Sequence, residues 1–170
     1  MKIRPATPTD VSALNQLVNG AYRGDNSRKG WTTEADLLDG IRTSEPALQK
    51  MIEKPSAFIL VLEENEQINA CVYLEKKDHR LYLGMLTVDP ALQGKGLGAL
   101  LMKAAEEKAA ELNCHIIQMS VITERDSLIN YYKRKGFKDT GERLPFPDDP
   151  AFGIPKQPLK FMIMEKELHK

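Results

Sequence analysis

The stretch VDPALQGKGLGALLMKAAEE, Val88 to Glu107, constrains the fold of this chain more than any other segment. An apolar run, LYLGMLTV, ends at Val88, and residues with helical spacing come afterwards, so a turn from a strand into a helix is predicted. One glycine would suffice for a tight turn, but this turn has three within five positions, Gly94, Gly96 and Gly98. That density favours a close approach of the backbone to a bound group. Because N–H groups at a helix start bind anions, the expected group is a phosphate.

Composition narrows the classes of partner. The 170 residues include 24 Lys plus Arg and 24 Asp plus Glu, so the formal net charge is zero, and we expect no nucleic-acid partner. The longest strongly apolar run, AFILVL at residues 57–62, is too short to span a membrane, and no membrane partner is expected. The N-terminus lacks the apolar region of a secretory signal, which predicts a cytoplasmic protein.

The two cysteines do not form a metal-ligand pattern. Cys71 and Cys114 lie far apart, each in or beside an apolar run, and are predicted to be buried thiols. No metal site is therefore expected. The basic run at residues 133–135 has two interpretations, a solvated helix end or a contact to a phosphate.

Hydrophobic periodicity predicts an order of strands and helices along the chain. Strands are expected at residues 2–6, 57–63, 67–76, 80–88, 114–121, 137–142 and 159–168, and helices from Thr9, from Thr33, from Ser44 to before Pro55, up to about residue 112 from the glycine-rich turn, and at 126–135. Polar turns between three successive strands favour an antiparallel meander. Residues 144–158, with five prolines, are predicted to be a loop. We expect residues 1–170 to form a single domain.

Two well-known phosphate-binding patterns match the glycine-rich turn incompletely. A Walker A loop requires Ser or Thr where Gly96 follows Lys95. The dinucleotide-binding pattern GxGxxG/A is satisfied literally by Gly94, Gly96 and Ala99. However, the next strand ends in QMSV, without the acidic residue that binds the ribose. The alternative that the chain is a nicotinamide-binding protein stays open, supported only by the literal GxGxxA match.

A third pattern accounts for more residues. The segment QGKGLG at residues 93–98, after LTVDP at 86–90, resembles the acetyl-CoA motif [RQ]xxGx[GA] of the Gcn5-related N-acetyltransferases, the GNAT family. Residues 132–137, YKRKGF, match that family's downstream Y-x-[KR]-x-G-F pattern. The predicted order of strands and helices is also the family's order. The resemblance implies an α/β (α+β) fold with a mixed, mostly antiparallel seven-stranded sheet, flanked by about four helices.

The resemblance also implies acetyl-CoA as cosubstrate and assigns residues to it. The diphosphate would be held by the backbone of Gln93, Gly94, Lys95, Gly96, Leu97, Gly98 and Ala99. The pantetheine arm would pair with the strand end at Leu86, Thr87 and Val88, which requires this strand to separate from the one at 114–121. Val88 N–H would bind the oxyanion, and Tyr132 would act as general acid toward the CoA sulfur.

Residues for the acceptor are assigned more loosely. In the family the first helices and their loop bind it, and here these carry Tyr22, Trp31 and Glu34. Arg125 stands where the common family pattern has Asn; it would face an acidic acceptor or a CoA phosphate, or lie on the surface at a helix start. The interpretation of Trp31 as a core residue is as open as its assignment to the acceptor site. Glu34, Glu75 and Glu124 are interpreted as surface charges, and no general base is assigned.

The resulting hypothesis is an N-acetyltransferase that moves an acetyl group from acetyl-CoA directly to a primary amine of a small molecule. Two alternatives stay open: a protein N-terminal or lysine acetyltransferase, and a CoA-binding sensor module without turnover. The acceptor's identity and the length of the acyl group are open as well. So is the choice between a monomer and a homodimer, since dimers are frequent in the family.

Overall fold

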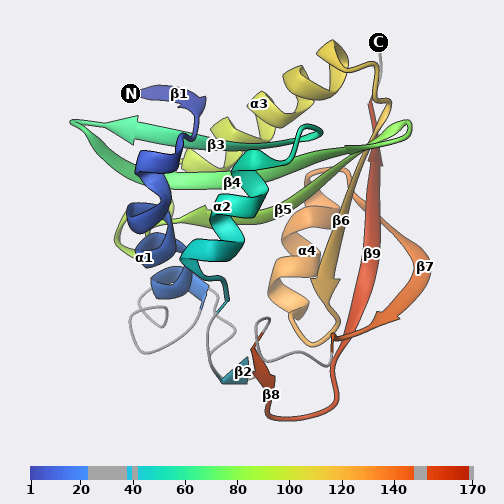
Figure 1. The fold of residues 1–170 in the computed structure, drawn as a ribbon. Coiled ribbons are helices and arrows are strands. Elements are labelled where there is room, and N and C mark those ends of the chain that lie inside the picture. The colour runs from blue at the N-terminus through green and yellow to red at the C-terminus, as the bar shows by residue number, and fades with distance from the viewer. Residues whose placement is uncertain (23–37, 40–41, 148–152, 169–170) are drawn as a thin grey trace.

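A seven-stranded mixed sheet organises the molecule (Figure 1). The computed structural model describes residues 1–22, 38–39, 42–147 and 153–168. The strand order is β1-β3-β4-β5-β6-β9-β7, and every neighbouring pair is antiparallel except β5 and β6. The strands are β1 Lys2–Pro5, β3 Ala57–Glu64, β4 Gln67–Lys77, β5 Arg80–Val88, β6 Ile116–Ile122, β7 Lys138–Pro145 and β9 Lys160–Glu167. This sheet confirms the fold class expected from the sequence.

Helices cover both faces of the sheet. They are α1 Val11–Tyr22, α2 Glu45–Glu53, α3 Leu97–Glu111 and α4 Asp126–Arg134. Apolar residues of α1 and α2 share one core cluster with alternate residues of β3, Ile59 and Val61. Those of α3 and α4 share a second cluster with the intervening residues, Leu60 and Leu62. Because successive side chains of a strand point to opposite faces, the two helix pairs lie on opposite sides of the sheet.

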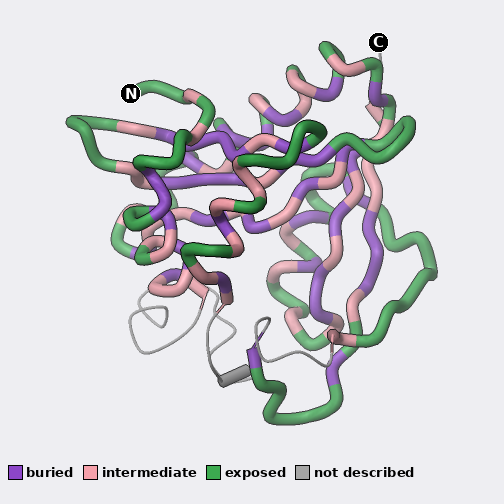
Figure 2. The backbone as a smooth tube through the Cα atoms, viewed as in Figure 1, coloured by how far each residue is buried: buried purple, intermediate pink, exposed green. Residues whose placement is uncertain are grey.

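Burial on both faces explains the unbroken apolar run of β3. A strand with one wet face alternates apolar and polar residues, whereas a strand covered on both faces reads as continuously hydrophobic. Figure 2 shows the buried residues concentrated on the central strands, while β7 at the sheet edge is exposed along its whole length. The site described below lies where two of the central strands separate.

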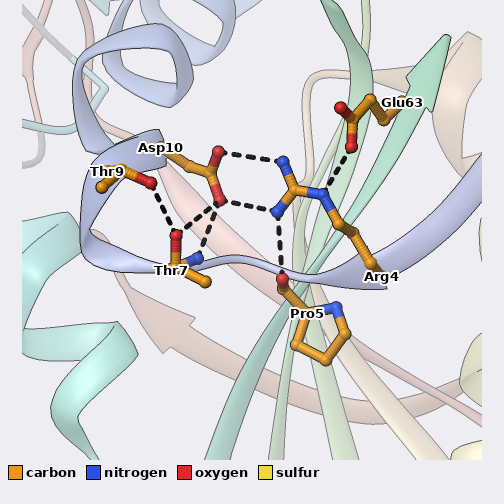
Figure 3. A network of polar contacts seen from close by, with 6 residues as sticks. All are labelled: Arg4, Pro5, Thr7, Thr9, Asp10 and Glu63. Carbon is orange, nitrogen blue, oxygen red and sulfur yellow. Dashed lines mark hydrogen bonds and ion pairs between the residues drawn. The ribbon is translucent and has the colours of Figure 1, made fainter. Parts of the chain in front are cut away.

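A polar network anchors the entry to α1 (Figure 3). The Arg4 guanidinium donates to both Asp10 carboxylate oxygens, at 2.8 and 3.0 Å, and also to the Glu63 carboxylate of β3. Asp10 in turn accepts from the Thr7 backbone N–H at 2.8 Å. The hydrogen bond from Arg4 is the main reason that the pKa of Asp10 lies below its ordinary value. Where the sequence predicted a helix from Thr9, the structure has a 3-10 turn, Pro8–Asp10, and α1 begins directly after it.

The helix expected from Thr33 lies mostly outside the described residues, which omit 33–37, and Leu38–Asp39 form a short strand, β2. Another sequence expectation is wrong in detail. The expected loop at 144–158 contains a strand, β8 Ile154–Pro155, which pairs with β2. Two-residue strands carry too little pattern to be recognised in a sequence, and Pro155 argues locally against one.

The strands β5 and β6 pair only at their beginning. Their register covers Arg80–Ile116, Leu81–Ile117 and Tyr82–Gln118, after which no further pair joins them. Farther along β5, Met85 has a positive φ of 53° and the register with β4 shifts by a residue, which marks a β-bulge. The separation of these two strands, required by the sequence hypothesis, is therefore present.

Candidate functional site

The glycine-rich turn leads from β5 into α3 with two residues in the left-handed region. Gly94 and Gly96 have φ of 85° and 79°, and Gly96 is the residue that caps the helix. A Cβ added at either glycine would meet no atom of the described chain within 4 Å, so the space beside this backbone is open. Leu100 N–H reaches the Gly96 carbonyl at 3.1 Å, whereas the preceding N–H groups of the first turn have no intrahelical acceptor. Open space beside such N–H groups suits a diphosphate.

A cavity of about 430 Å³ adjoins this turn and the end of β5. Of the predicted cosubstrate residues, nine line it: Leu86, Thr87, Val88, Gln93, Gly94, Gly96, Leu97, Gly98 and Ala99. Lys95 is exposed and is not among the lining residues. Two cations at the end of α4, Arg134 and Lys135, also line the cavity, which favours the phosphate interpretation of this basic run.

A second cavity, of about 270 Å³, shares part of its lining with the first. It is formed by the middle of β5, the end of β6 and the start of β9, together with residues of α1, α2 and α4. Both cavities are lined by Tyr22, Leu86, Arg125, Leu128 and Tyr132. The two cavities therefore meet at a narrow set of side chains around the separated strands.

Tyr132 lies at this junction on α4. The residue is only 6% exposed, and its ring makes edge contacts with Tyr131 and Phe137, at centroid distances of 5.4 and 5.7 Å. Burial raises the pKa of the Tyr132 phenol above its ordinary value, with the Tyr22 phenol adding to the effect and the Arg125 cation opposing it. The phenol is therefore protonated throughout the neutral range and can donate.

Of the residues predicted to bind the acceptor, the structure brings Tyr22 and Arg125 close together. The Tyr22 hydroxyl donates to the Leu86 carbonyl at 2.7 Å, and the Arg125 guanidinium lies 5.9 Å from the centre of the Tyr22 ring. Trp31 and Glu34 lie outside the described residues. The sequence analysis missed Arg42, which lies 5.2 Å from the Tyr22 ring centre and lines the second cavity. No sequence signal could have found it, because it precedes α2 without a motif.

Glu75 is not the surface charge that was expected. It is 8% exposed, accepts a hydrogen bond from Tyr73 at 2.6 Å and pairs with Lys54 at 2.8 Å. Burial raises the pKa of Glu75, but the hydrogen bonds from Lys54 and Tyr73 outweigh it and hold the pKa below its ordinary value. Glu124, by contrast, is exposed as expected. Glu75 is thus an ionised carboxylate that orients Tyr73, a lining residue of the second cavity.

Both cysteines are buried as expected, and burial raises the pKa of the Cys71 thiol to about 12. Among the described residues, no cluster of histidine, cysteine and carboxylate side chains could hold a metal ion. Within the same part of the chain, no helix is long and apolar enough to cross a membrane.

Comparison with known proteins decides the family. The model of the acetyltransferase (GNAT) family matches residues 18–137, which include the glycine-rich turn and Tyr132. The chain belongs to the GNAT family. Its spermine/spermidine N(1)-acetyltransferase relative from Bacillus subtilis (strain 168) is 36% identical over 69 residues, covering 40% of this chain and 45% of that protein. The chain thus aligns with less than half the length of this relative.

Solved GNAT-like structures share the fold over nearly the whole chain. The protein smu.2055 from Streptococcus mutans UA159 superposes with a TM-score of 0.74 at 19% identity, covering 99% of this chain and all (100%) of that one. The PaiA N-acetyltransferase from Thermoplasma acidophilum, solved in complex with coenzyme A, gives a TM-score of 0.70 at 18% identity, with 98% of each chain covered. At these identities the likeness establishes the fold.

Proposed function

We propose that this GNAT protein transfers an acetyl group from acetyl-CoA directly to a primary amine of a small molecule. The observation that carries the proposal is the junction of two cavities at Tyr132, one beside the glycine-rich turn and the other beyond the separated strands. A donor and an acceptor entering from opposite sides would meet there without a covalent enzyme intermediate. The PaiA structure, which contains coenzyme A, supports the donor's identity.

The donor's diphosphate would rest on the backbone of the turn, with Arg134 and Lys135 providing countercharge at the cavity wall. The pantetheine amides would pair with the free edge of β5. Support for this comes from the β4–β5 ladder: Asp89 N–H bonds to the Asn69 carbonyl at 2.9 Å, and Ala70 and Val88 are the next pair. Since hydrogen-bonded and non-hydrogen-bonded pairs alternate, the backbone groups of Val88 point away from β4, toward the opening. Val88 N–H is therefore our proposed oxyanion donor.

The chemistry requires a neutral amine that attacks the acetyl carbonyl carbon. The new C–N bond forms, the C–S bond breaks, and the sulfur takes a proton while the nitrogen loses one. Tyr132 is our proposed proton donor to the sulfur, because its phenol is protonated and lines both cavities. The proton released by the nitrogen restores the phenol through solvent. No carboxylate is assigned as the base.

Thermal unfolding with acetyl-CoA, CoA, NADH and ATP tests the donor site first. A ligand at about 100 times its Kd adds roughly 2.7 kcal/mol to the free energy of unfolding. For a chain of this length that corresponds to a Tm rise of about 5–10 °C. A rise with acetyl-CoA and CoA alone supports the proposal, whereas a rise only with NADH would restore the dinucleotide interpretation.

Thiol release in the presence of amines tests the transfer itself. Turnover of small amines supports the proposal, and turnover only of peptides would favour a protein acetyltransferase. Binding of CoA without turnover of any amine or peptide would favour a sensor module. Because both cysteines are buried, a thiol reagent will report released CoA with little signal from the protein.

A further inference from the structure

A tyrosine and a carboxylate on β4 form a hydrogen-bonded pair beside the second cavity. Tyr73 and Glu75 lie two residues apart, so their side chains leave the same face of the sheet. This is the face covered by α1 and α2, because Tyr73 packs against the core cluster that these helices share with β3. The Tyr73 hydroxyl donates to Glu75 Oε1 at 2.6 Å, and Glu75 Oε2 pairs with the Lys54 ammonium at 2.8 Å. Lys54 directly follows α2, so these contacts join that helix to the strand.

The protonation states of this pair fix the direction of its hydrogen bond. Burial raises the pKa of Glu75, but the hydrogen bonds from Lys54 and Tyr73 bring it below its ordinary value. Burial, the hydrogen bond to Glu75 and the charge of that residue all raise the pKa of the Tyr73 phenol. At neutral pH an ionised carboxylate, which can only accept, therefore faces a protonated phenol. Because the phenol has one hydrogen and gives it to Glu75, its oxygen can only accept from a third group.

Packing also holds the Tyr73 ring in place. Its centre lies 6.5 Å from that of the Tyr82 ring, edge to face. Tyr82 extends over Gly84, which is the residue opposite Tyr73 in the β4–β5 ladder. A Cβ added at Gly84 would lie 2.9 Å from Tyr82 Cε1, so a side chain at this position would displace the ring. The Lys77 ammonium lies 4.7 Å from the Tyr82 ring centre and adds a cation–π attraction. The Tyr73 oxygen is thus positioned by two neighbours, Glu75 and Tyr82.

This oxygen belongs to the second cavity alone. Tyr73, Tyr82 and Gly84 line that cavity and not the first, whereas Tyr132 lines both. An amine that reacts at the junction presents its nitrogen there and another part of its body to Tyr73. A group on that body with a hydrogen to donate would satisfy the Tyr73 oxygen. An ether oxygen in the same place would face another acceptor and leave both atoms without a hydrogen bond.

We infer that the acceptor carries, besides its reacting amine, a second hydrogen-bond donor that binds the Tyr73 oxygen, and that Glu75 is the positioning residue that keeps this oxygen an acceptor. The donor can be a hydroxyl, an amide N–H or a further amino group. The inference rests on the proposed function and specifies its substrate class.

Straight-chain amino alcohols of increasing length, each compared with its own methyl ether, test the inference. The two members of a pair share the amine, the chain and the distal oxygen, but only the alcohol can donate from that oxygen. Thiol release gives kcat/KM for each. At the best chain length we expect the alcohol to exceed its ether about tenfold, the upper range for one hydrogen bond. Tyr73→Phe keeps the ring and should bring this ratio to within about twofold of one.

Two further variants separate positioning from structure. In Glu75→Gln the new amide can donate to the phenol oxygen, which frees the Tyr73 hydroxyl to donate in turn, so the ratio should fall although the Tyr73 side chain is still present. Tyr82→Phe is the matched control. No carboxylate of the described residues receives the Tyr82 hydroxyl, which can turn to donate or to accept, so its loss should affect alcohol and ether alike and preserve the ratio. Thermal unfolding checks that each variant is folded, and Tyr73→Phe decides the matter if Glu75→Gln is not.

Binding without turnover provides a second readout. With CoA in place of acetyl-CoA no transfer can occur, and calorimetry measures the affinities of the same amines. We expect the wild type to bind the best alcohol at least fivefold more tightly than its ether, and Tyr73→Phe to lose this preference. The inference is overturned if alcohols and ethers are equal at every length, or if Tyr73→Phe weakens both equally; turnover would then still support the proposed function. If no amine is acetylated, the proposed function fails, and the calorimetry alone decides whether Tyr73 selects a donor group.

Discussion

Replacing Tyr132 by phenylalanine separates a catalytic role from a structural one. The substitution removes only the hydroxyl and keeps the ring that contacts Tyr131 and Phe137. No hydrogen bond joins this hydroxyl to any described residue, so its loss leaves no partner unsatisfied. We therefore expect the free energy of unfolding to change by no more than about 0.5 kcal/mol, within the range of neutral substitutions.

The expected effect on turnover is much larger. General acid catalysis contributes about 10²–10⁴-fold, and the raised pKa makes this phenol a weaker acid, which places the expected loss near the lower limit. A fall in kcat of about 100-fold corresponds to roughly 2.7 kcal/mol in the activation free energy. The affinity for acetyl-CoA should change by less than about twofold, which in free energy is well below the roughly 1.4 kcal/mol of a tenfold change.

Steady-state thiol release measures kcat, calorimetry measures the affinity for acetyl-CoA, and thermal unfolding measures stability. Tyr82→Phe is the control, since Tyr82 lines only the second cavity; it should change the KM for the amine and leave kcat within about threefold. A kcat of Tyr132→Phe close to the wild-type value would refute the acid role. A large fall in Tm together with kcat would show instead that the hydroxyl is structural.

Three further predictions concern the turn, the N-terminal network and the pH profile. Gly96→Ala should weaken CoA binding at least tenfold, because the added Cβ enters the open space beside the turn. Gly141→Ala is the control, since Gly141 has a similar φ of 87°. Both variants should lose about 1 kcal/mol of stability in thermal unfolding, but Gly141→Ala should not lose CoA binding. Asp10→Asn should destabilise the fold by about 2 kcal/mol at pH 7. The folded-state pKa of Asp10 is lowered, so its contribution exists above the unfolded pKa of about 3.9 and is lost as the pH falls through the folded value; unfolding curves of wild type and variant should therefore converge in acid. Because the pKa of Tyr132 is raised above about 10, kcat/KM should not decline between about pH 8 and 10, and a decline there would contradict the acid role.

Long periodic segments made most of the fold predictable. β5 has the bounds expected from the sequence, and α2 begins after its Ser44 cap, whose side chain accepts from Ala47 N–H at 3.3 Å. The start of α1 was less predictable, since Asp10 is held by Arg4 and ends a 3-10 turn instead of opening the helix. The pairing of β2 with β8 depends on residues more than a hundred positions apart, which no local pattern records.

The two cavities differ in how much the sequence revealed about them. Two short motifs supply much of the lining of the first cavity, so the sequence could indicate that Gly94, Gly96 and Tyr132 belong to one site. The second cavity is assembled from separate strands and helices, and Arg42 lines it from the segment before α2, where its backbone N–H bonds to Asn19. Side chains brought together by the tertiary fold leave no common pattern in the sequence. The burial of Glu75 was missed as well: Lys54, which follows α2, pairs with it across the fold, and Tyr73, two residues earlier on β4, donates to it.

The short pairing between β5 and β6 has a consequence for how this fold diversifies. Beyond Tyr82 and Gln118 the two strands expose main-chain groups to the opening between them. Main-chain groups are the same whatever the amino acid, so the pantetheine pairing that we propose there would tolerate almost any substitution that keeps the strands in place. Side-chain recognition of an amine in the second cavity would have no such tolerance. Under this proposal a lineage with this architecture could exchange its amine repeatedly while its acyl donor stays fixed, and similarity in overall shape would say far more about the donor than about the amine.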